Sequence, residues 1–255
     1  MLILSLQWLL TLLFILFGIV AATVPRYVKS GSPRHLLLWS VTGITFLLQG
    51  LNRLAQNTFG TWAYFAGPET RVFRSYLVAL PAANHSRTFA MLAFCVVLGV
   101  LTFWRRELSR SLTLLLSVGV VLAGMGVGAV VGWYEGAFRI QPHFSAVAVS
   151  DAFELVFLLA ALFAVLIGNQ VDRLLWLALT AYTFNVALNI LWMIGLSALG
   201  VAWAPSVLHM NLYRVTLLAI MVCAAMRRVY LARREIPTRG LLESVPPQAS
   251  AMSMG

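Results

Sequence analysis

Long apolar stretches alternate with short polar segments along the chain. Seven of these stretches are close to 20 residues long, the length an α-helix needs to cross the hydrocarbon core of a bilayer. The pattern predicts an all-α polytopic integral membrane protein with a seven-helix transmembrane domain over residues 1–226. The predicted spans are Leu2–Val24, Leu36–Leu54, Thr88–Trp104, Leu112–Gly132, Phe144–Gly168, Leu174–Leu199 and Val207–Met226.

Basic residues between the spans set the predicted orientation. Most of them follow spans one, three, five and seven, and few lie in the opposite loops, so the positive-inside rule places the N-terminus outside and the C-terminus in the cytoplasm. A cleaved signal peptide is a less consistent interpretation of span one, because no basic residue precedes its apolar core. The residues on the cytoplasmic side are Arg26, Lys29, Arg34, Arg105, Arg106, Arg110, Arg173, Arg227, Arg228, Arg233, Arg234 and Arg239, against Arg71, Arg74, Arg87 and Arg139 outside.

Two segments outside the spans are long. Residues 56–87 are predicted to form a long outer loop, in which 71–80 suit a short helix on the membrane interface. The tail, residues 227–255, begins as a basic extension of span seven and becomes polar and Pro-rich after Ile236. This composition is typical of a membrane-surface anchor followed by disorder, and the tail is too short for an output domain.

Composition supports the membrane assignment and narrows the partners. With 61% hydrophobic and 10% charged residues, the chain has too little polar surface for a soluble globule of 255 residues. The net charge of +10 lies in short clusters between apolar runs, so lipid headgroups rather than nucleic acid are the expected counterions. We expect an integral protein of the bacterial cytoplasmic (inner) membrane.

Charged residues inside the predicted spans all fall in the outer half. They are Arg53, Asp151, Glu154 and Arg214. Amides share their helical faces at three- and four-residue spacing. Charges at that depth are costly unless paired or hydrated, so they should turn inward, and the best partner of Arg214 by depth is Glu154. The predicted ligand-binding residues are Gln49, Asn52, Arg53, Asp151, Glu154, Asn185, Asn189, His209, Asn211 and Arg214.

This polar set has two compatible interpretations. It is either a buried ion-pair and amide network that fixes helix register, or the wall of a cavity open to the outside. Three outer histidines, His85, His143 and His209, are candidate ligands of a zinc ion or a haem together with Asp151 or Glu154. Their spacing matches no metal-binding motif, so interfacial hydrogen bonding is the simpler interpretation, and the cofactor stays unknown. The single lysine, Lys29, lies in a cytoplasmic loop, which excludes a retinal Schiff base in the membrane.

Small residues predict local packing. Gly124, Gly128 and Gly132 recur at four-residue spacing, which gives one helix face that a neighbour can approach closely. A neighbour in the same chain is favoured over one in a second copy. Cys95 and Cys223 lie in different spans at different depths, so a disulfide between them is not expected.

Three functions remain open from the sequence. The first is a non-enzymatic protein that senses or holds a small ligand in its outer cavity, or serves as an accessory subunit with a membrane or cytoplasmic protein partner. The second is a small-solute or proton-coupled transporter of 3+1+3 type, in which two parallel three-helix repeats are joined by a single helix. Similar residues in spans two and six, at 51–54 and 188–191, suggest it. The third is a membrane enzyme acting on a lipid or isoprenoid, with Asp151 or Glu154 as acid or base and histidines assisting.

Overall fold

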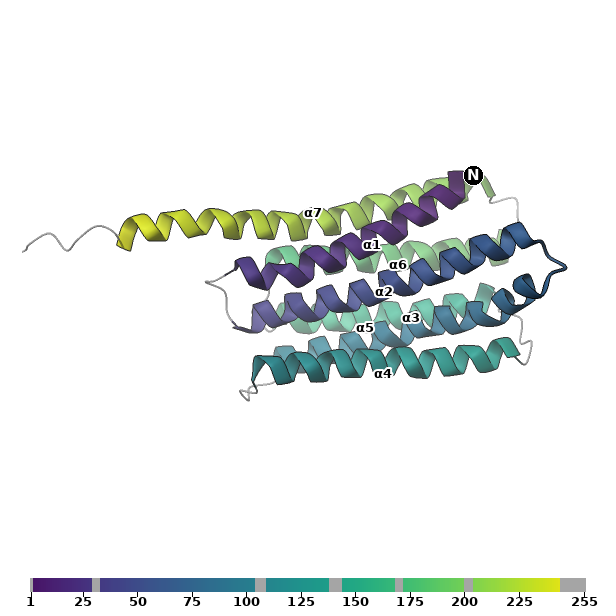
Figure 1. Ribbon diagram of the computed structural model, residues 1–255, viewed down its shortest axis with the longest axis horizontal. Coiled ribbons are helices and arrows are strands. Elements are labelled where there is room, and N and C mark those ends of the chain that lie inside the picture. Colours follow the sequence, from purple (N-terminus) through teal and green to yellow (C-terminus); the bar gives the residue numbers. More distant parts are fainter. Residues whose placement is uncertain are drawn as a thin grey trace, which may run out of the picture.

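The computed structural model describes residues 2–28, 33–103, 109–137, 144–167, 172–199 and 204–243, and all regular structure in these ranges is α-helical. The prediction of an all-α fold is confirmed. The helices are α1 (Leu2–Tyr27), α2 (Pro33–Ala66), α3 (Arg71–Phe103), α4 (Arg110–Ala137), α5 (Phe144–Ile167), α6 (Arg173–Leu199) and α7 (Ala204–Glu243), shown in Figure 1.

Several helices are long and apolar enough to cross a membrane, so the chain is an integral membrane protein in a lipid bilayer. Among the described residues, the qualifying segments are Ser5–Tyr27, Arg71–Phe103, Arg110–Ala137, Arg173–Leu191 and Leu208–Arg233. Helix α2 is less apolar because Gln49, Asn52 and Arg53 interrupt its hydrophobic run. In α5 the described side chains begin only at Asp151.

The outer loop predicted over residues 56–87 is mostly helix instead. Helices α2 and α3 extend into it and leave only residues 67–70 between them. They contain 34 and 33 residues, or about 50 Å each at 1.5 Å per residue, well beyond the roughly 30 Å of hydrocarbon. Polar side chains end the hydrophobic run near Leu54, so hydropathy alone does not detect these extensions.

The turn between α2 and α3 follows from its local sequence. Gly67 adopts a left-handed φ of 93°, and its N–H donates to the Ala63 carbonyl at 3.2 Å, which closes α2. Pro68 follows and lacks the N–H that would extend the α2 hydrogen-bond pattern. Thr70 caps α3 by accepting the Phe73 N–H on its hydroxyl at 3.3 Å. The hairpin is therefore defined by a helix-stop and a helix-start signal within four residues.

Helix α7 also continues further than predicted. It passes Met226, the predicted end of span seven, and continues through Ile236 to Glu243, so the first part of the predicted disordered tail is helical. The remainder of the predicted disorder, residues 244–255, lies outside the described residues.

Six of the helices form a closed ring. The packed neighbours in order are α1, α2, α3, α5, α6 and α7, and α7 returns to α1. Helix α4 lies outside this ring, against α3 and to a lesser extent α2, at the lower edge of the bundle in Figure 1. The polar positions of the ring helices therefore converge on a common centre, whereas α4 is peripheral.

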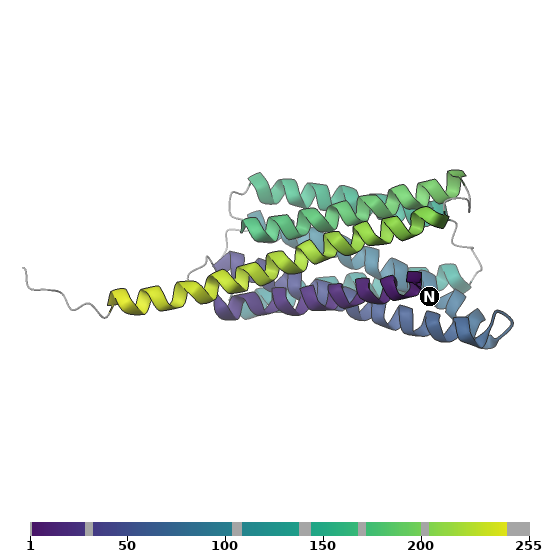
Figure 2. The same cartoon turned by 90° about the horizontal axis from the view of Figure 1, so that it is seen from above.

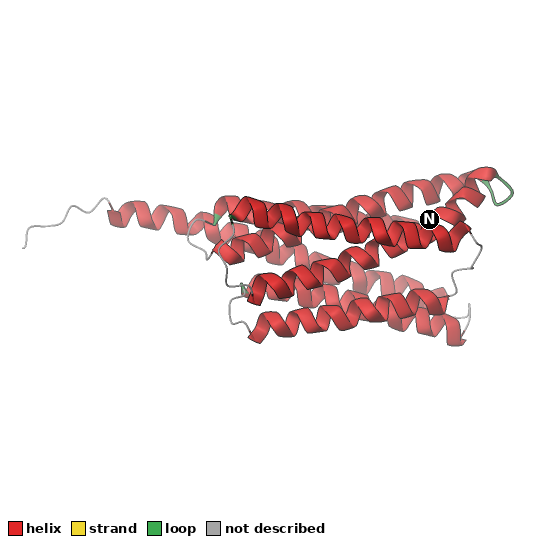
Figure 3. Ribbon diagram, turned by 90° about the horizontal axis from the view of Figure 1, so that it is seen from below, coloured by secondary structure: helices red, strands yellow, loops and turns green. Residues whose placement is uncertain are grey.

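The two ends of the bundle differ. The N-terminus and the projecting α2–α3 hairpin lie at one end, called here the N-terminal end (Figure 3). The continuation of α7 projects from the opposite end, called here the C-terminal end (Figures 1 and 2).

The two cysteines form no disulfide, in agreement with the different depths predicted for them. Cys95 is buried and Cys223 is exposed, and both are free.

Glycines allow the close contact between α3 and α4. A Cβ atom added at Gly128 would lie 2.3 Å from the His85 carbonyl oxygen, and one added at Gly132 would lie 2.3 Å from the Pro81 carbonyl oxygen. Gly124 and Gly136 meet the same face of α3. The predicted small-residue face therefore packs within the chain.

We expect Gly132→Ala to destabilise the protein and Gly126→Ala not to. The added methyl group at position 132 meets backbone atoms of α3, and overpacking costs about 1–3 kcal/mol. Position 126 has nothing within 4 Å, so alanine there only improves helix propensity, by up to about 1 kcal/mol. Thermal unfolding midpoints in detergent measure both, and equal midpoints for the two variants would contradict the α3–α4 contact.

Candidate ligand-binding pocket

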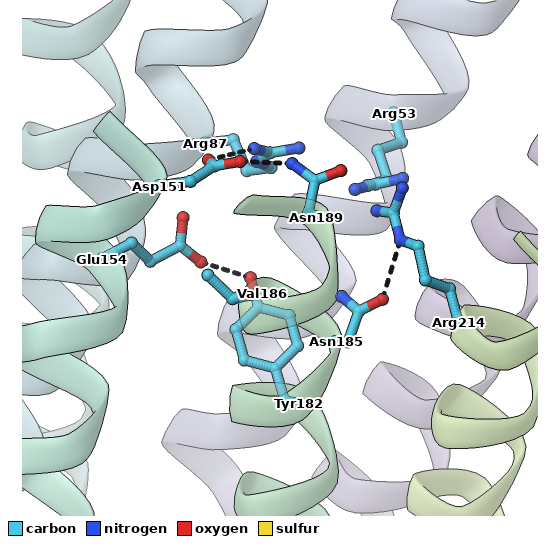
Figure 4. A pocket seen from close by; sticks show the side chains of 9 residues that line it. All are labelled: Arg53, Arg87, Asp151, Glu154, Tyr182, Asn185, Val186, Asn189 and Arg214. Carbon is cyan, nitrogen blue, oxygen red and sulfur yellow. Dashed lines mark hydrogen bonds and ion pairs between the residues drawn. The ribbon is translucent and has the colours of Figure 1, made fainter. Parts of the chain in front are cut away.

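A small polar pocket lies at the centre of the helix ring, with about 200 Å³ of free space including the part open to the surroundings. It occupies the N-terminal half of α5 and α7, as the positions of Asp151, Glu154 and Arg214 show. Helix α4 contributes no lining residue. The lining residues are Arg53 of α2, Arg87 of α3, Asp151 and Glu154 of α5, Tyr182, Asn185, Val186 and Asn189 of α6, and Arg214 of α7 (Figure 4).

Asp151 is the most fully bonded residue of the pocket. Arg87 Nη2 donates to its Oδ1 at 2.9 Å, and Asn189 Nδ2 donates to its Oδ2 (Figure 4). The carboxylate is only 1% exposed, so both of its oxygens need partners from the protein. These contacts join α3, α5 and α6 at a single charge.

Glu154 has one bonded and one unbonded oxygen. The Tyr182 hydroxyl donates to its Oε1 at 2.6 Å. Its Oε2 is buried and has no hydrogen-bond partner among the described residues. A buried carboxyl group with one open position is suited to exchange a proton or to bind a further donor in the pocket.

Two arginines lie in the pocket without a carboxylate partner in the described part of the chain. Arg214 donates from Nε to the Asn185 amide oxygen at 3.0 Å. The guanidinium of Arg53 lies over the Phe14 ring, 4.7 Å from its centroid, and its Nε is buried without a hydrogen bond. The predicted pairing of Arg214 with Glu154 is therefore wrong. Depth alone suggested it, but α6 lies between α5 and α7 in the ring and supplies the closer partners.

Aromatic side chains occupy the ring interior towards the C-terminal end. Phe46 contacts Tyr182, Phe17 and Phe94 edge-to-face, with centroid separations of 4.8, 5.0 and 6.2 Å, and Phe14 stacks on it at 5.8 Å. All four phenylalanines are at most 1% exposed. The polar pocket therefore has an apolar floor on that side.

The predicted amides of α2 join helices and do not line the pocket. Gln49 donates to the Arg87 carbonyl oxygen at 3.0 Å, and Asn52 donates to the Ala83 carbonyl oxygen at 2.9 Å. One turn further, Gln56 bonds the Asn84 side chain at 3.3 Å. Together they connect one face of α2 to α3.

Two predicted residues of α7 also lie away from the pocket. Asn211 accepts a hydrogen bond from Gln7 of α1 at 3.3 Å. The His209 side chain is exposed. The structure thus brings together Arg53, Asp151, Glu154, Asn185, Asn189 and Arg214 from the predicted set.

The candidate metal ligands do not converge in the described structure. His85 pairs with Glu135 between α3 and α4. His143 lies outside the described residues, and the described His209 is exposed. Among the described residues no three His, Cys, Asp or Glu side chains are placed to hold a metal ion.

Sequence reasoning missed Arg87 and Tyr182 as pocket residues. Arg87 was assigned to an outer loop one residue before span three, but α3 begins sixteen residues earlier at Arg71. For Tyr182 a signal existed, because it precedes Asn185 and Asn189 by three and seven residues and so shares their helical face.

A second polar cluster lies at the C-terminal end, where none was expected. Asp172 caps α6 by accepting the Leu174 N–H at 3.0 Å and also accepts the Trp39 indole N–H at 3.1 Å. It forms an ion pair with Arg228 of α7. This residue joins α2, α6 and α7 below the aromatic floor.

No protein-family model, curated protein or solved structure matches this chain. The chemistry of the pocket therefore has to be argued from its own residues.

We expect Arg87→Gln to lower the thermal unfolding midpoint strongly, because it leaves Asp151 buried without its cation. Breaking one side of a buried pair costs about 3–5 kcal/mol. Asp151→Asn should also destabilise, and the double variant should lose less than the two single losses combined. Arg74→Gln, an exposed position on the same helix, is the matched control and should change little. Additive losses would contradict the pair.

Proposed function

We propose that this protein is a seven-span membrane protein of the bacterial inner membrane, with the N-terminus outside and the C-terminus in the cytoplasm, that binds a small polar ligand in its central pocket. We further propose that it acts without catalysis, as a ligand-sensing module or an accessory subunit. The orientation rests on the excess of arginines after spans one, three, five and seven. On this orientation the N-terminal end of the bundle faces outward.

The observation that carries the binding function is the convergence of five helices on one polar pocket. Charged and amide groups from α2, α3, α5, α6 and α7 line it. If these residues only held the helices together, each charged group would be expected to have a partner. Instead, two arginines have no carboxylate partner in the described structure, and one carboxyl oxygen has no hydrogen bond. The aromatic floor closes the pocket towards the cytoplasmic side, so access from outside is favoured.

A sensing or accessory role is supported by α7. Arg214 lies in the pocket, and the same helix carries Arg228 at the Asp172 cluster and continues to Glu243 beyond the bundle. A single rigid element thus connects the ligand to the surface where a membrane or cytoplasmic protein partner would bind.

Transport of 3+1+3 type is a second candidate, favoured by the chain order around the ring. Helices α1, α2 and α3 are consecutive neighbours, as are α5, α6 and α7, with equivalent junctions at α3–α5 and α7–α1. Helix α4 links the halves from outside. Two parallel three-helix halves around a central site are typical of such transporters.

The lipid or isoprenoid enzyme gains less support. In this hypothesis histidines assist Asp151 or Glu154, whereas His85 pairs with Glu135 and His209 is exposed. His143 lies outside the described residues.

Accessibility of an introduced cysteine tests the binding function. In a background of Cys95→Ala and Cys223→Ala, we expect Asn185→Cys to react with a charged, membrane-impermeant thiosulfonate added outside, and not with the same reagent added inside. Phe94→Cys in the floor is the control that should stay unreactive from both sides.

The outcomes separate the candidates. Reaction of position 185 from both sides would overturn the sensor and favour transport. Absence of reaction from both sides would overturn access to the pocket from water, and with it the proposed sensing of a ligand from outside. Cross-linking in native membranes tests the accessory role, which fails if the chain is recovered only as a free monomer.

Reporter fusions test the orientation. Alkaline phosphatase, which is active only outside the cytoplasm, should be active when fused after Thr70 and inactive when fused after Gly255. The α2–α3 turn and the C-terminus lie on opposite sides in the proposed topology. The reverse activities would show the inverted orientation.

A further inference from the structure

We propose that the pocket binds a small monovalent anion, of the size of chloride or formate, between Arg53 and Arg214. This inference rests on the proposed ligand-binding function and names the chemical class of the ligand. Figure 4 shows both guanidinium groups directed into the same space between α2 and α7.

The charge balance of the pocket requires an anion. Three arginines line it, Arg53, Arg87 and Arg214, against two carboxyl groups, Asp151 and Glu154. Arg87 and Asp151 satisfy each other at 2.9 Å. Even with Glu154 ionised, the remaining groups carry one positive charge in excess.

Glu154 is not positioned to neutralise either remaining arginine. Its bonded oxygen accepts from Tyr182, and no ion pair joins it to Arg53 or Arg214 in the described structure. Arg214 is held by a neutral amide, and Arg53 by the face of an aromatic ring. Each partner orients a guanidinium group but does not neutralise its positive charge.

Burial makes this excess costly. Arg53 is 9% exposed and Arg214 is 5% exposed, so neither cation is solvated by bulk water. Two like charges directed into one low-dielectric space repel each other, and an uncompensated buried cation is unfavourable. The buried, unbonded Nε of Arg53 is a further donor without an acceptor. An anion between the two groups would neutralise the excess and supply the missing acceptor.

The size of the pocket selects the anion. About 200 Å³ of space is shared among nine side chains and includes the part open to the surroundings. Most of this space lies in narrow gaps between side chains, so the room for a bound group is close to that of one water molecule. This suits a small ion and excludes a sugar, a nucleotide or a lipid headgroup. With Glu154 ionised, the single excess positive charge matches a monovalent anion, whereas a divalent sulfate would leave one negative charge unbalanced.

Thermal unfolding of the purified full-length protein tests the inference. The protein is dialysed into sodium gluconate, whose anion is too large for the pocket, and gluconate is then replaced by chloride or formate at constant ionic strength. We expect the midpoint to rise by several degrees and to saturate, as mass action on a folded-state site requires. Sulfate should produce no saturable rise.

Variants assign the effect to the pocket. In Arg53→Gln and Arg214→Gln the rise with chloride should disappear, while Arg110→Gln, an exposed arginine, should keep it. An arginine with a purely structural role would lower the midpoint equally in gluconate and in chloride. If either pocket variant does not fold, equilibrium binding of radioactive chloride to the unmodified protein, with displacement by formate, provides the second measurement.

Each result has a defined meaning. One saturable chloride per chain supports the site, and stronger stabilisation by formate identifies carboxylates as its preferred source of anion. No saturable effect of either anion, or an equal effect in the pocket variants, overturns it. If anions have no effect while position 185 is still labelled from outside, only the anion inference fails. If chloride binds while position 185 is unreactive, the anion site stands and the proposed sensing of a ligand from outside fails.

Discussion

The ion pair between Arg87 and Asp151 is the contact on which the closed helix ring depends. It joins α3 to α5, which are adjacent in space although α4 lies between them in the chain. The same carboxylate holds Asn189, so α6 is fixed to this junction as well. A salt bridge at this depth is worth little as net stability, because desolvating both charges cancels most of the attraction. An arrangement of α3 and α5 that separated the pair would leave two buried charges without partners.

Around that junction, different residues hold the helices together and line the pocket. The amides Gln49 and Asn52 hold α2 to α3 at the level of the pocket, and Asp172 gathers three helices near the C-terminal end. The aromatic floor lies between the pocket and Asp172. Helix α4 stays outside and holds α3 through glycine contacts. The helices around the pocket are thus held together by contacts made outside it, so its partly unbonded groups are kept in place.

Hydropathy and spacing predicted the helices and much of the pocket, and their failures have a common cause. A sequence locates a residue along a helix, which was enough to group Asp151, Glu154, Asn185 and Asn189. It does not reveal which helices are neighbours around a ring. Partners chosen by depth were therefore wrong for Arg214, whose neighbour is Asn185. Arg87 was missed for a second reason. Where a helix extends beyond its apolar segment, hydropathy does not distinguish the extension from a loop.

Helix α7 is long enough for a small tilt at one point to displace its far end by several ångströms. From Arg214 to Glu243 the helix is continuous, which corresponds to about 44 Å at 1.5 Å per residue. A tilt of about 5° at Arg214 would displace the far end by about 4 Å over that length. Buried aromatic side chains fill the ring interior below the pocket, but such a displacement needs no open path between them. A small change in tilt at the buried charges would therefore be enlarged at the part of α7 that projects beyond the bundle.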